Sequence, residues 1–245
     1  MRFPHLRHTV LTAGLLMLGA AGPAYASDWN GCYAGAAIGA ASADMNTEDA
    51  PFEKGDFGGS GASWNSGGPP YETIKSDASA FTGGLTGGCD WAMPRERLTF
   101  VFGVVGDLSA WNLESNSVSS LSSDTHVDYD MNLSLSVRAR AGIALGNVLF
   151  YGTGGLVASD LSLDVSDSQG PGLIDISNSA FQGGWVAGAG VEFKLNERWS
   201  AQLEYQHMQF GVTATGEAID PVGAVPRFEG DVNIDIVRLG LLLRL

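Results

Sequence analysis

The chain has 245 residues, of which 34 are glycine, and its 27 acidic against 13 basic residues give a formal net charge of −14. Such an acidic chain is a poor nucleic-acid binder, because neutralising phosphates needs clustered Lys and Arg. Beyond the N-terminal segment, no apolar run approaches the roughly 20 residues of a membrane-spanning helix, which argues against helical spans.

The first 26 residues predict a cleaved signal peptide. Arg2 and Arg7 accompany an almost wholly apolar stretch at 10–21, and small residues at Ala24 and Ala26 form a cleavage site. The apolar stretch is too short to cross a bilayer, so an uncleaved anchor is the less favoured alternative. Cleavage between Ala26 and Ser27 leaves one domain at 27–245.

The rest of the chain is organised in segments that alternate between apolar and polar residues with a period of two, which is typical of half-buried strands. Each segment is long enough to cross a bilayer at a tilt. The eight predicted strands are 29–41, 79–91, 98–112, 132–144, 148–161, 181–195, 199–212 and 232–245.

The connections between these strands alternate in length. Tight turns at 93–97, 145–147 and 196–198 alternate with long segments at 42–78, 113–131, 162–180 and 213–231. Outer-membrane barrels have short periplasmic turns and long outward loops. The sequence therefore predicts an all-β fold, an eight-stranded antiparallel transmembrane up-and-down β-barrel, whose Gly-, Ser-, Asn- and Asp-rich long segments are mobile and solvent-exposed.

The two faces of the strands favour a membrane barrel. In the last strand Val237, Leu239 and Leu241 share one face, and Arg238 and Arg244 lie on the other. The fourth strand repeats the pattern. Apolar residues outside and charges inside are typical of membrane barrels, whereas a lipocalin-like soluble barrel would invert the two faces.

The same alternation predicts a charge network in the lumen. Isolated buried charges are very costly, so these residues are expected to pair and to plug the narrow interior of an eight-stranded barrel. The predicted members are Asp107, Arg138, Arg140, Glu192, Lys194, Glu204 and Arg238. Aromatic residues near strand ends or on the outer face predict interfacial girdles. They are Trp29, Trp91, Trp185, Trp199 and Tyr205.

Residues for chemistry are few. Only His126 and His207 follow the signal segment, and His126 lies among Ser122, Ser123 and Asp124. An acyl-transfer site there is much less favoured than a loop histidine, so the prediction is no enzyme, no catalytic residues, no cofactor and no metal site. Acids such as those at 128–130 could hold divalent cations near lipopolysaccharide, but scattered loop carboxylates usually only solvate loops.

Eight short fragments, in order, resemble a known family, the small outer-membrane barrels of alpha-proteobacteria. These are the immunogenic or opacity-type porin-like proteins, whose transmembrane part is similar to an OmpA-like barrel. The fragments lie at 29–35, 83–91, 102–107, 138–142, 151–155, 188–192, 199–205 and 237–241. The resemblance implies the outer membrane of a Gram-negative bacterium and barrel-assembly machinery as a partner during biogenesis.

Three features depart from the family pattern. The chain ends in Leu245 where the family usually has an aromatic residue, so less efficient assembly is expected. Val105 replaces an acidic residue and removes one member of the expected lumen network. Cys32 and Cys89 stand where the family tends to carry aromatics, near the periplasmic ends of neighbouring strands. In the oxidising periplasm they could form a cross-strand disulfide, the alternative being two small apolar residues in contact with lipid.

The leading functional hypothesis is a non-enzymatic outer-membrane protein, expected to be a monomer, for envelope integrity and surface interaction. Its partners are outer-membrane lipid and lipopolysaccharide, and not nucleic acid. The alternative is a narrow porin for small solutes, which differs in having a continuous water path through the lumen.

Overall fold

The computed structural model describes residues 29–55, 61–122, 124–167, 174–178, 180–218 and 223–245. The predicted signal peptide and its cleavage site lie outside these residues. No helix in the described part of the chain is long and apolar enough to cross a membrane. The strands are β1 Gly31–Ala50, β2 Thr73–Pro94, β3 Thr99–Val118, β4 Thr125–Leu145, β5 Val148–Ser159, β6 Ser162–Asp167, β7 Asp175–Asn178, β8 Gln182–Lys194, β9 Trp199–Thr215 and β10 Arg227–Arg244.

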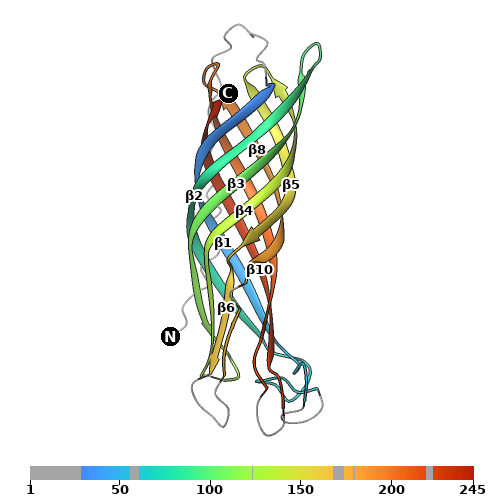
Figure 1. Cartoon of the computed structure of the whole chain (residues 1–245), viewed down its shortest axis with the longest axis vertical. Helices are drawn as coiled ribbons and strands as arrows, with labels where there is room; N and C mark the ends of the chain where they lie inside the picture. Colours follow the sequence, from blue (N-terminus) through green and yellow to red (C-terminus); the bar gives the residue numbers. More distant parts are fainter. Residues whose placement is uncertain (1–28, 56–60, 123, 168–173, 179, 219–222) are drawn as a thin grey trace, which may run out of the picture.

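Eight of these strands close into an antiparallel ring. The order is β3-β2-β1-β10-β9-β8-β5-β4, and a further pairing of β4 with β3 completes the circle. β6 pairs with β4 and with β7, so it extends the wall begun by β5. Figure 1 shows the tilted strands as one long barrel, with the C-terminus at one end and the long connections at the other. We call these the turn end and the loop end.

The strands are longer than the alternation predicts. β1 continues to Ala50, β2 starts at Thr73, and β9 runs to Thr215, so much of the sequence assigned to mobile loops belongs to the barrel wall. β6 and β7 also lie in a segment assigned to a loop. The prediction of eight crossings is confirmed, whereas the predicted boundaries at the loop end are wrong.

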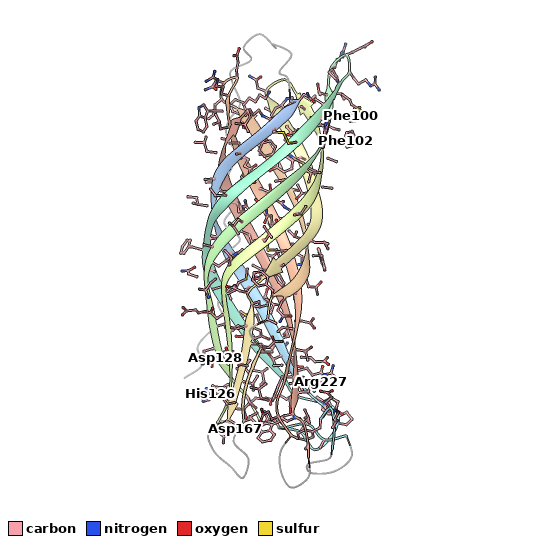
Figure 2. All side chains as sticks on the ribbon, viewed as in Figure 1. Phe100, Phe102, His126, Asp128, Asp167 and Arg227 are labelled. Atoms are coloured by element: carbon pink, nitrogen blue, oxygen red, sulfur yellow. A yellow bond between two sulfur atoms is a disulfide. The ribbon has the colours of Figure 1, made fainter. Side chains whose placement is uncertain are left out.

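The half of the barrel near the turn end carries an apolar belt on its outer surface. Ile38, Phe81 and Leu156 are each at least 70 % exposed, and Phe100 and Phe102 stand on the outer wall in Figure 2. The alternating residues of β4, such as Arg138 and Arg140, are buried inside. This half therefore has the polarity of a barrel in a lipid bilayer.

The half near the loop end has the opposite polarity. Its inner face is apolar, with fully buried Met131, Phe210 and Ile234, while neighbours such as Asp128 point outward. Figure 2 shows His126, Asp128 and Arg227 at this end of the molecule. An apolar interior under a polar surface is the pattern of a water-exposed barrel. The inverted polarity, with apolar residues inside and polar residues outside, was expected only for a soluble, lipocalin-like barrel. It is present here in one half of a continuous barrel.

An irregularity in the wall lies between the two halves. In β4 both Asn132 and Leu133 face outward, and the buried alternation resumes at Ser134. Both backbone N–H groups donate to Asp160 Oδ1, at 3.0 and 2.8 Å. Asp160 lies in the short break between β5 and β6. Between the pairs Ser134–Ser159 and Asp130–Ser162, β4 has one residue more than the β5–β6 side. The Asp160 carboxylate therefore satisfies the donors that this extra residue leaves without ladder partners.

Candidate functional site: the lumen and the loop end

The lumen contains two clusters of ion pairs in its membrane half. The first is centred on Arg138, whose guanidinium lies 2.5 Å from Asp107 and 2.5 Å from Glu204. Arg238 reaches the second oxygen of Asp107 at 2.7 Å. All four side chains are almost completely buried. Their mutual pairing offsets the cost of removing these charges from water.

The second cluster lies nearer to the turn end and is centred on Arg140. Its guanidinium contacts Glu192 at 2.5 Å and Asp90 at 3.2 Å. Arg244, from the last strand, reaches the same two carboxylates at 2.8 and 3.4 Å. Two arginines thus share two acids, an arrangement that links β2, β4, β8 and β10 across the lumen.

Tyr151 connects the two clusters. Its hydroxyl donates to Glu204 Oε2 at 2.7 Å, and its ring centroid lies 3.9 Å from Arg140 Cζ. Tyr33 adds a second ring near Arg140, with its hydroxyl 3.2 Å from Nη1. Aromatic faces attract guanidinium groups, so these rings fill the gaps between the charges. The polar layer is therefore packed with side chains from several walls.

Six of the seven residues predicted for the network belong to these clusters. The seventh, Lys194, lies at the turn end, where its ammonium is 4.6 Å from the ring centroid of Trp29. Asp90 and Arg244 complete the second cluster and were missed in the predicted network. The outward orientation expected for Cys89 already implied that Asp90 faces inward, and Arg244 had been placed on the inner face. Val105, which stands where the family has an acidic residue, is buried in the barrel wall.

Trp29 closes the lumen at the turn end. It is 1 % exposed, and its indole N–H donates to Gly146 O at 3.0 Å. Lys194 and Arg244 lie over its ring, and Val101 and Leu149 belong to the same buried cluster. The expectation that Trp29 belongs to an interfacial girdle is wrong, because its ring packs against lumen cations. Trp91, Trp185, Trp199 and Tyr205 are all at least 40 % exposed.

At the loop end, the described residues of the connection between β1 and β2, 51–55 and 61–72, cover the apolar core. We call this connection the first loop. Trp64 packs against this core and donates its indole N–H to Asp167 Oδ2 at 2.9 Å. Glu53 N donates to Val225 O, and Val225 N to Lys54 O, at 3.0 and 2.9 Å. The first loop is thereby joined to the wall strand β6 and to the connection before β10.

Two buried carboxylates hold the first loop in place. Asp49 accepts bonds from the Ser63 hydroxyl and from the N–H groups of Trp64 and Asn65, at 2.6 to 3.0 Å. Glu72 accepts bonds from the hydroxyl groups of Ser119 and Ser120 and from two backbone N–H groups of the same turn. The described part of the first loop consequently forms a cap that is fastened to the barrel wall.

The two carboxylates titrate differently. Burial raises the pKa of Asp49, although its three hydrogen bonds oppose this. For Glu72, burial also acts upward, but the hydrogen bonds from Ser119, Ser120 and Leu121 outweigh it and lower the pKa. Glu72 is therefore the group whose negative charge stabilises the cap.

A disulfide joins Cys32 and Cys89, as the sequence suggested. The two residues are directly opposite each other in the β1–β2 ladder, close to the turn end. Cys32 is exposed on the outer face, where the prediction placed it. The bond fixes the register of the first two strands, and its sulfur atoms face away from the ion pairs of the lumen.

His126 lies in β4 and not in a loop, so the prediction of a loop histidine is wrong. Ser122 donates to Asp124, and among the described residues no hydrogen bond joins His126 to either; Ser123 lies outside the described residues. His207 lies on the outer wall, where Nδ1 is 2.8 Å from Asp235 Oδ1, and Tyr205 donates to the same oxygen. No group of three or more described His, Cys, Asp or Glu residues could hold a metal ion.

The closed ring, the apolar belt and the charged lumen define a β-barrel of the Gram-negative outer membrane. The model of the outer membrane protein beta-barrel domain matches residues 11–241, and the chain belongs to this family. The turn end is accordingly periplasmic and the loop end extracellular.

Named relatives are outer-membrane proteins of Brucella. The chain is 32 % identical to the 25 kDa outer-membrane immunogenic protein of Brucella abortus. The matched segment covers 57 % of this chain and 55 % of that relative. It is 25 % identical to the 31 kDa outer-membrane immunogenic protein of Brucella melitensis over 90 % of this chain and 85 % of the other. The resemblance to alpha-proteobacterial immunogenic barrels is thus confirmed.

Solved structures share the fold. OprG from Pseudomonas aeruginosa superimposes with a TM-score of 0.54 at 14 % identity, over 88 % of this chain and 97 % of the other. The outer membrane protease OmpT from Escherichia coli gives 0.51 at 8 % identity, over 87 % and 96 %. At these identities the two structures support the barrel architecture alone.

Proposed function

We propose that the protein is a non-enzymatic outer-membrane barrel that supports envelope integrity and presents its capped extracellular end for surface interaction. The observation that carries this proposal is the filling of the lumen in three successive layers. Trp29 and its neighbours occupy the periplasmic end, the ion pairs occupy the membrane half, and the apolar core occupies the extracellular half. Such a filled interior suits an anchor better than a channel.

The extracellular half supports the second part of the proposal. On the outer face of β10 the apolar belt ends at Val237, and Asp235 begins a polar stretch that reaches Arg227. Eight residues of tilted strand raise the cap by about 20 Å above the belt. The cap would then stand clear of the lipid headgroups. The word "immunogenic" in the names of the relatives fits an accessible surface of this kind.

Planar-bilayer recording tests the anchor against the narrow porin. The folded protein should give no discrete conductance steps. Arg138→Ala should also be silent, because it disturbs the polar layer and leaves the apolar core in place. Reproducible steps from the unaltered protein would instead support the porin.

A deletion strain tests the role in the envelope. Loss of the protein should increase sensitivity to detergent, and the full chain should restore resistance. A variant with the first loop replaced by a short turn should restore resistance but lose recognition by antibodies against the intact cap. A heat-dependent shift on SDS gels checks that each variant is folded. If the deletion leaves detergent sensitivity unchanged, the role in envelope integrity is wrong.

The remaining partners follow from this proposal. The barrel-assembly machinery would insert the chain, and lipopolysaccharide and lipid would surround it. The closed ring leaves no unpaired strand edge in the membrane half, which favours a monomer. Light scattering in detergent should give the mass of one chain.

A further inference from the structure

The outer wall of the membrane half carries two adjoining hollows, of about 590 and 490 Å³, over β3, β4 and β5. They share Phe102, Ala141 and Gly152, so they form one continuous groove, which we call the belt groove. The three shared residues follow one another in a single row of the ladder. Trp91 lies opposite Phe102 and extends this row to β2. The row therefore begins with two aromatic rings and continues over small residues.

The floor of the belt groove is open because its residues are small. A Cβ atom built at Gly154 would meet no atom within 4 Å, and one at Gly152 would meet only a backbone oxygen, at 3.8 Å. The rings of Phe100, Phe102 and Phe150 stand beside this floor, and each is at least 38 % exposed. No water enters the core of a bilayer, so hydrocarbon chains fill an apolar groove at this position.

The belt groove reaches the periplasmic border of the membrane at the hairpin of β2 and β3. The pairing of β1 with β2 ends at Asp90, so the residues from Trp91 to Pro94 pair with β3 alone and the hairpin projects beyond β1. Figure 2 shows Phe100 and Phe102 on the outer wall beside this hairpin. Exposed tryptophans of membrane proteins lie at the level of the lipid headgroups. The turn that follows Trp91 is therefore in the headgroup region of the periplasmic leaflet.

This turn carries a positive charge that the other two turns of the periplasmic end lack. It contains Arg95 and Arg97, both exposed, with Glu96 between them. Among the described residues, no acidic side chain forms an ion pair with either arginine. The turns at 145–147 and 195–198 have no net charge. Guanidinium groups bind phosphate oxygens, so the end of the belt groove is complementary to an anionic headgroup.

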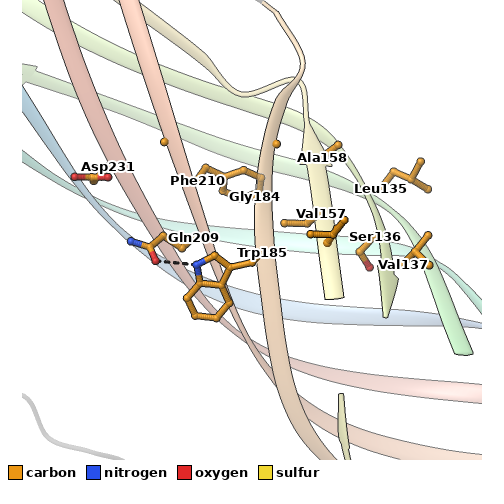
Figure 3. A pocket seen from close by; sticks show the side chains of 13 residues that line it. Leu135, Ser136, Val137, Val157, Ala158, Gly184, Trp185, Gln209, Phe210 and Asp231 are labelled. Carbon is orange, nitrogen blue, oxygen red and sulfur yellow. Dashed lines mark hydrogen bonds between the residues drawn. The ribbon is translucent and has the colours of Figure 1, made fainter. Parts of the chain in front are cut away.

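A further hollow of the outer wall differs in location and in charge. It has a volume of about 830 Å³ and lies at the extracellular border of the apolar belt, where Figure 3 shows Asp231 at one end and Leu135 at the other. None of its described lining residues is Lys or Arg. It offers no cation to a phosphate group, which makes it a control surface for the belt groove.

We propose that the belt groove binds one acyl chain of an anionic phospholipid of the periplasmic leaflet, whose phosphate pairs with Arg95 and Arg97. The chain lies on Gly152 and Gly154 beside Phe102. Four residues of strand at about 3.3 Å each and a tilt of about 40° place Arg95 about 10 Å beyond Trp91 along the membrane normal. A phosphate between them is within reach of the guanidinium groups.

This site goes beyond the proposed function. It depends on the orientation of the barrel in the membrane and not on whether the lumen conducts or the envelope weakens without the protein. Its failure is therefore separable from the failure of the proposed function.

Native mass spectrometry of the folded protein in detergent tests the site. The protein is titrated with phosphatidylglycerol or with phosphatidylethanolamine carrying the same acyl chains. We expect one retained phosphatidylglycerol, bound roughly tenfold more tightly than phosphatidylethanolamine. Arg95→Gln together with Arg97→Gln should abolish this preference. Arg198→Gln, in the turn between β8 and β9, should leave it unchanged.

Valine substitutions test the groove itself. Gly152→Val and Gly154→Val fill the floor and should each weaken retention roughly tenfold. Gly183→Val adds the same side chain at an open position of the extracellular hollow and should leave retention unchanged. A heat-dependent gel shift checks folding. Trp91→Ala, which removes the ring next to the headgroup, replaces any valine variant that does not fold.

Three outcomes would overturn the proposal. Equal retention of the two lipids by the unaltered protein would contradict the anionic site. Equal effects of Gly183→Val and the groove variants would mean non-specific annular lipid only. A dimer in place of a lipid adduct, abolished by Gly154→Val, would mean that a second copy of the chain occupies the belt groove.

Discussion

Trp64 in the first loop and Asp167 at the end of β6 are joined by a 2.9 Å hydrogen bond over the mouth of the barrel. They are 103 positions apart in the chain. The same indole ring packs on the apolar core below it. One side chain therefore both covers the core and holds a distant wall strand, so the cap and the wall should open together.

Replacing this tryptophan should loosen the cap without unfolding the barrel. Trp64→Phe keeps an aromatic ring at this position but removes the N–H donor to a carboxylate, a bond worth about 1.5–3 kcal/mol. Cleavage of the first loop by a protease should accelerate roughly tenfold or more, because it follows the population of the open cap. The heat-dependent gel shift should not change. Trp91→Phe, on the apolar belt, is the control, and an unaltered cleavage rate in Trp64→Phe would argue against this link.

Acid should loosen the turn held by Glu72. The pKa of this carboxyl is below its ordinary value of 4.5, so its charge stabilises the folded cap. This stabilisation is present above pH 4.5 and is lost as the pH falls through the lower folded-state pKa. Hydrogen exchange at the amides of Ser120 and Leu121, corrected for intrinsic rates, should lose protection in that range. In Glu72→Ala the protection should be low at every pH, and a pH-dependent loss in this variant would assign the effect to another group.

Removal of Arg140 should strongly destabilise the barrel. Arg140→Ala leaves Asp90 and Glu192 buried with fewer partners, and such a loss typically costs about 3–5 kcal/mol. Urea unfolding in detergent measures this change in free energy. Arg227→Ala breaks an exposed pair with Glu229 at the loop end and should cost about 1 kcal/mol or less. Similar midpoints for the two variants would show that the lumen network adds little to stability.

The disulfide should stabilise the barrel through the unfolded chain. Cys32 and Cys89 are separated by 57 positions, and closing a loop of that size contributes up to about 4 kcal/mol in the chain-entropy model. Cys32→Ser together with Cys89→Ser should therefore lower the urea midpoint while leaving the folded barrel intact. Mass spectrometry after alkylation without reductant provides the control. Two alkylated thiols in the unaltered protein would show that the disulfide is not formed.

The membrane half of the barrel was predictable because its alternation is simple. Val237, Leu239 and Leu241 face lipid, Arg238 faces the lumen, and this pattern fixes the strand and its orientation together. The same alternation also placed the arginines and acids on the inner face of the barrel. It could not assign which arginine meets which acid, because this depends on the strand tilt and on the register across the ring.

The extracellular half was missed although its alternation is equally regular. Val127, Tyr129 and Met131 are buried, with Asp128 and Asp130 between them. Alternation with acidic residues on the outer face predicts a loop as long as a membrane barrel is expected to have only apolar residues outside. The extra residue at Asn132 and Leu133 also interrupts the periodicity at the point where the polarity changes. Trp29 was misassigned for a different reason: it has the same inward parity as Tyr33, but its position at a strand end favoured an interfacial girdle.

The pairing of β1 with β10 has a consequence for biogenesis. Tyr33 lies opposite Arg244, so the first wall strand of the chain is joined to the last. All other neighbouring strands in the ring can pair in the order in which they emerge. The pairing of β1 with β10 can form only once β10 is present. A product truncated before β10 would keep two open strand edges, which are templates for aggregation. The edges of β1 and β9 must therefore be kept from pairing with other chains until β10 joins them.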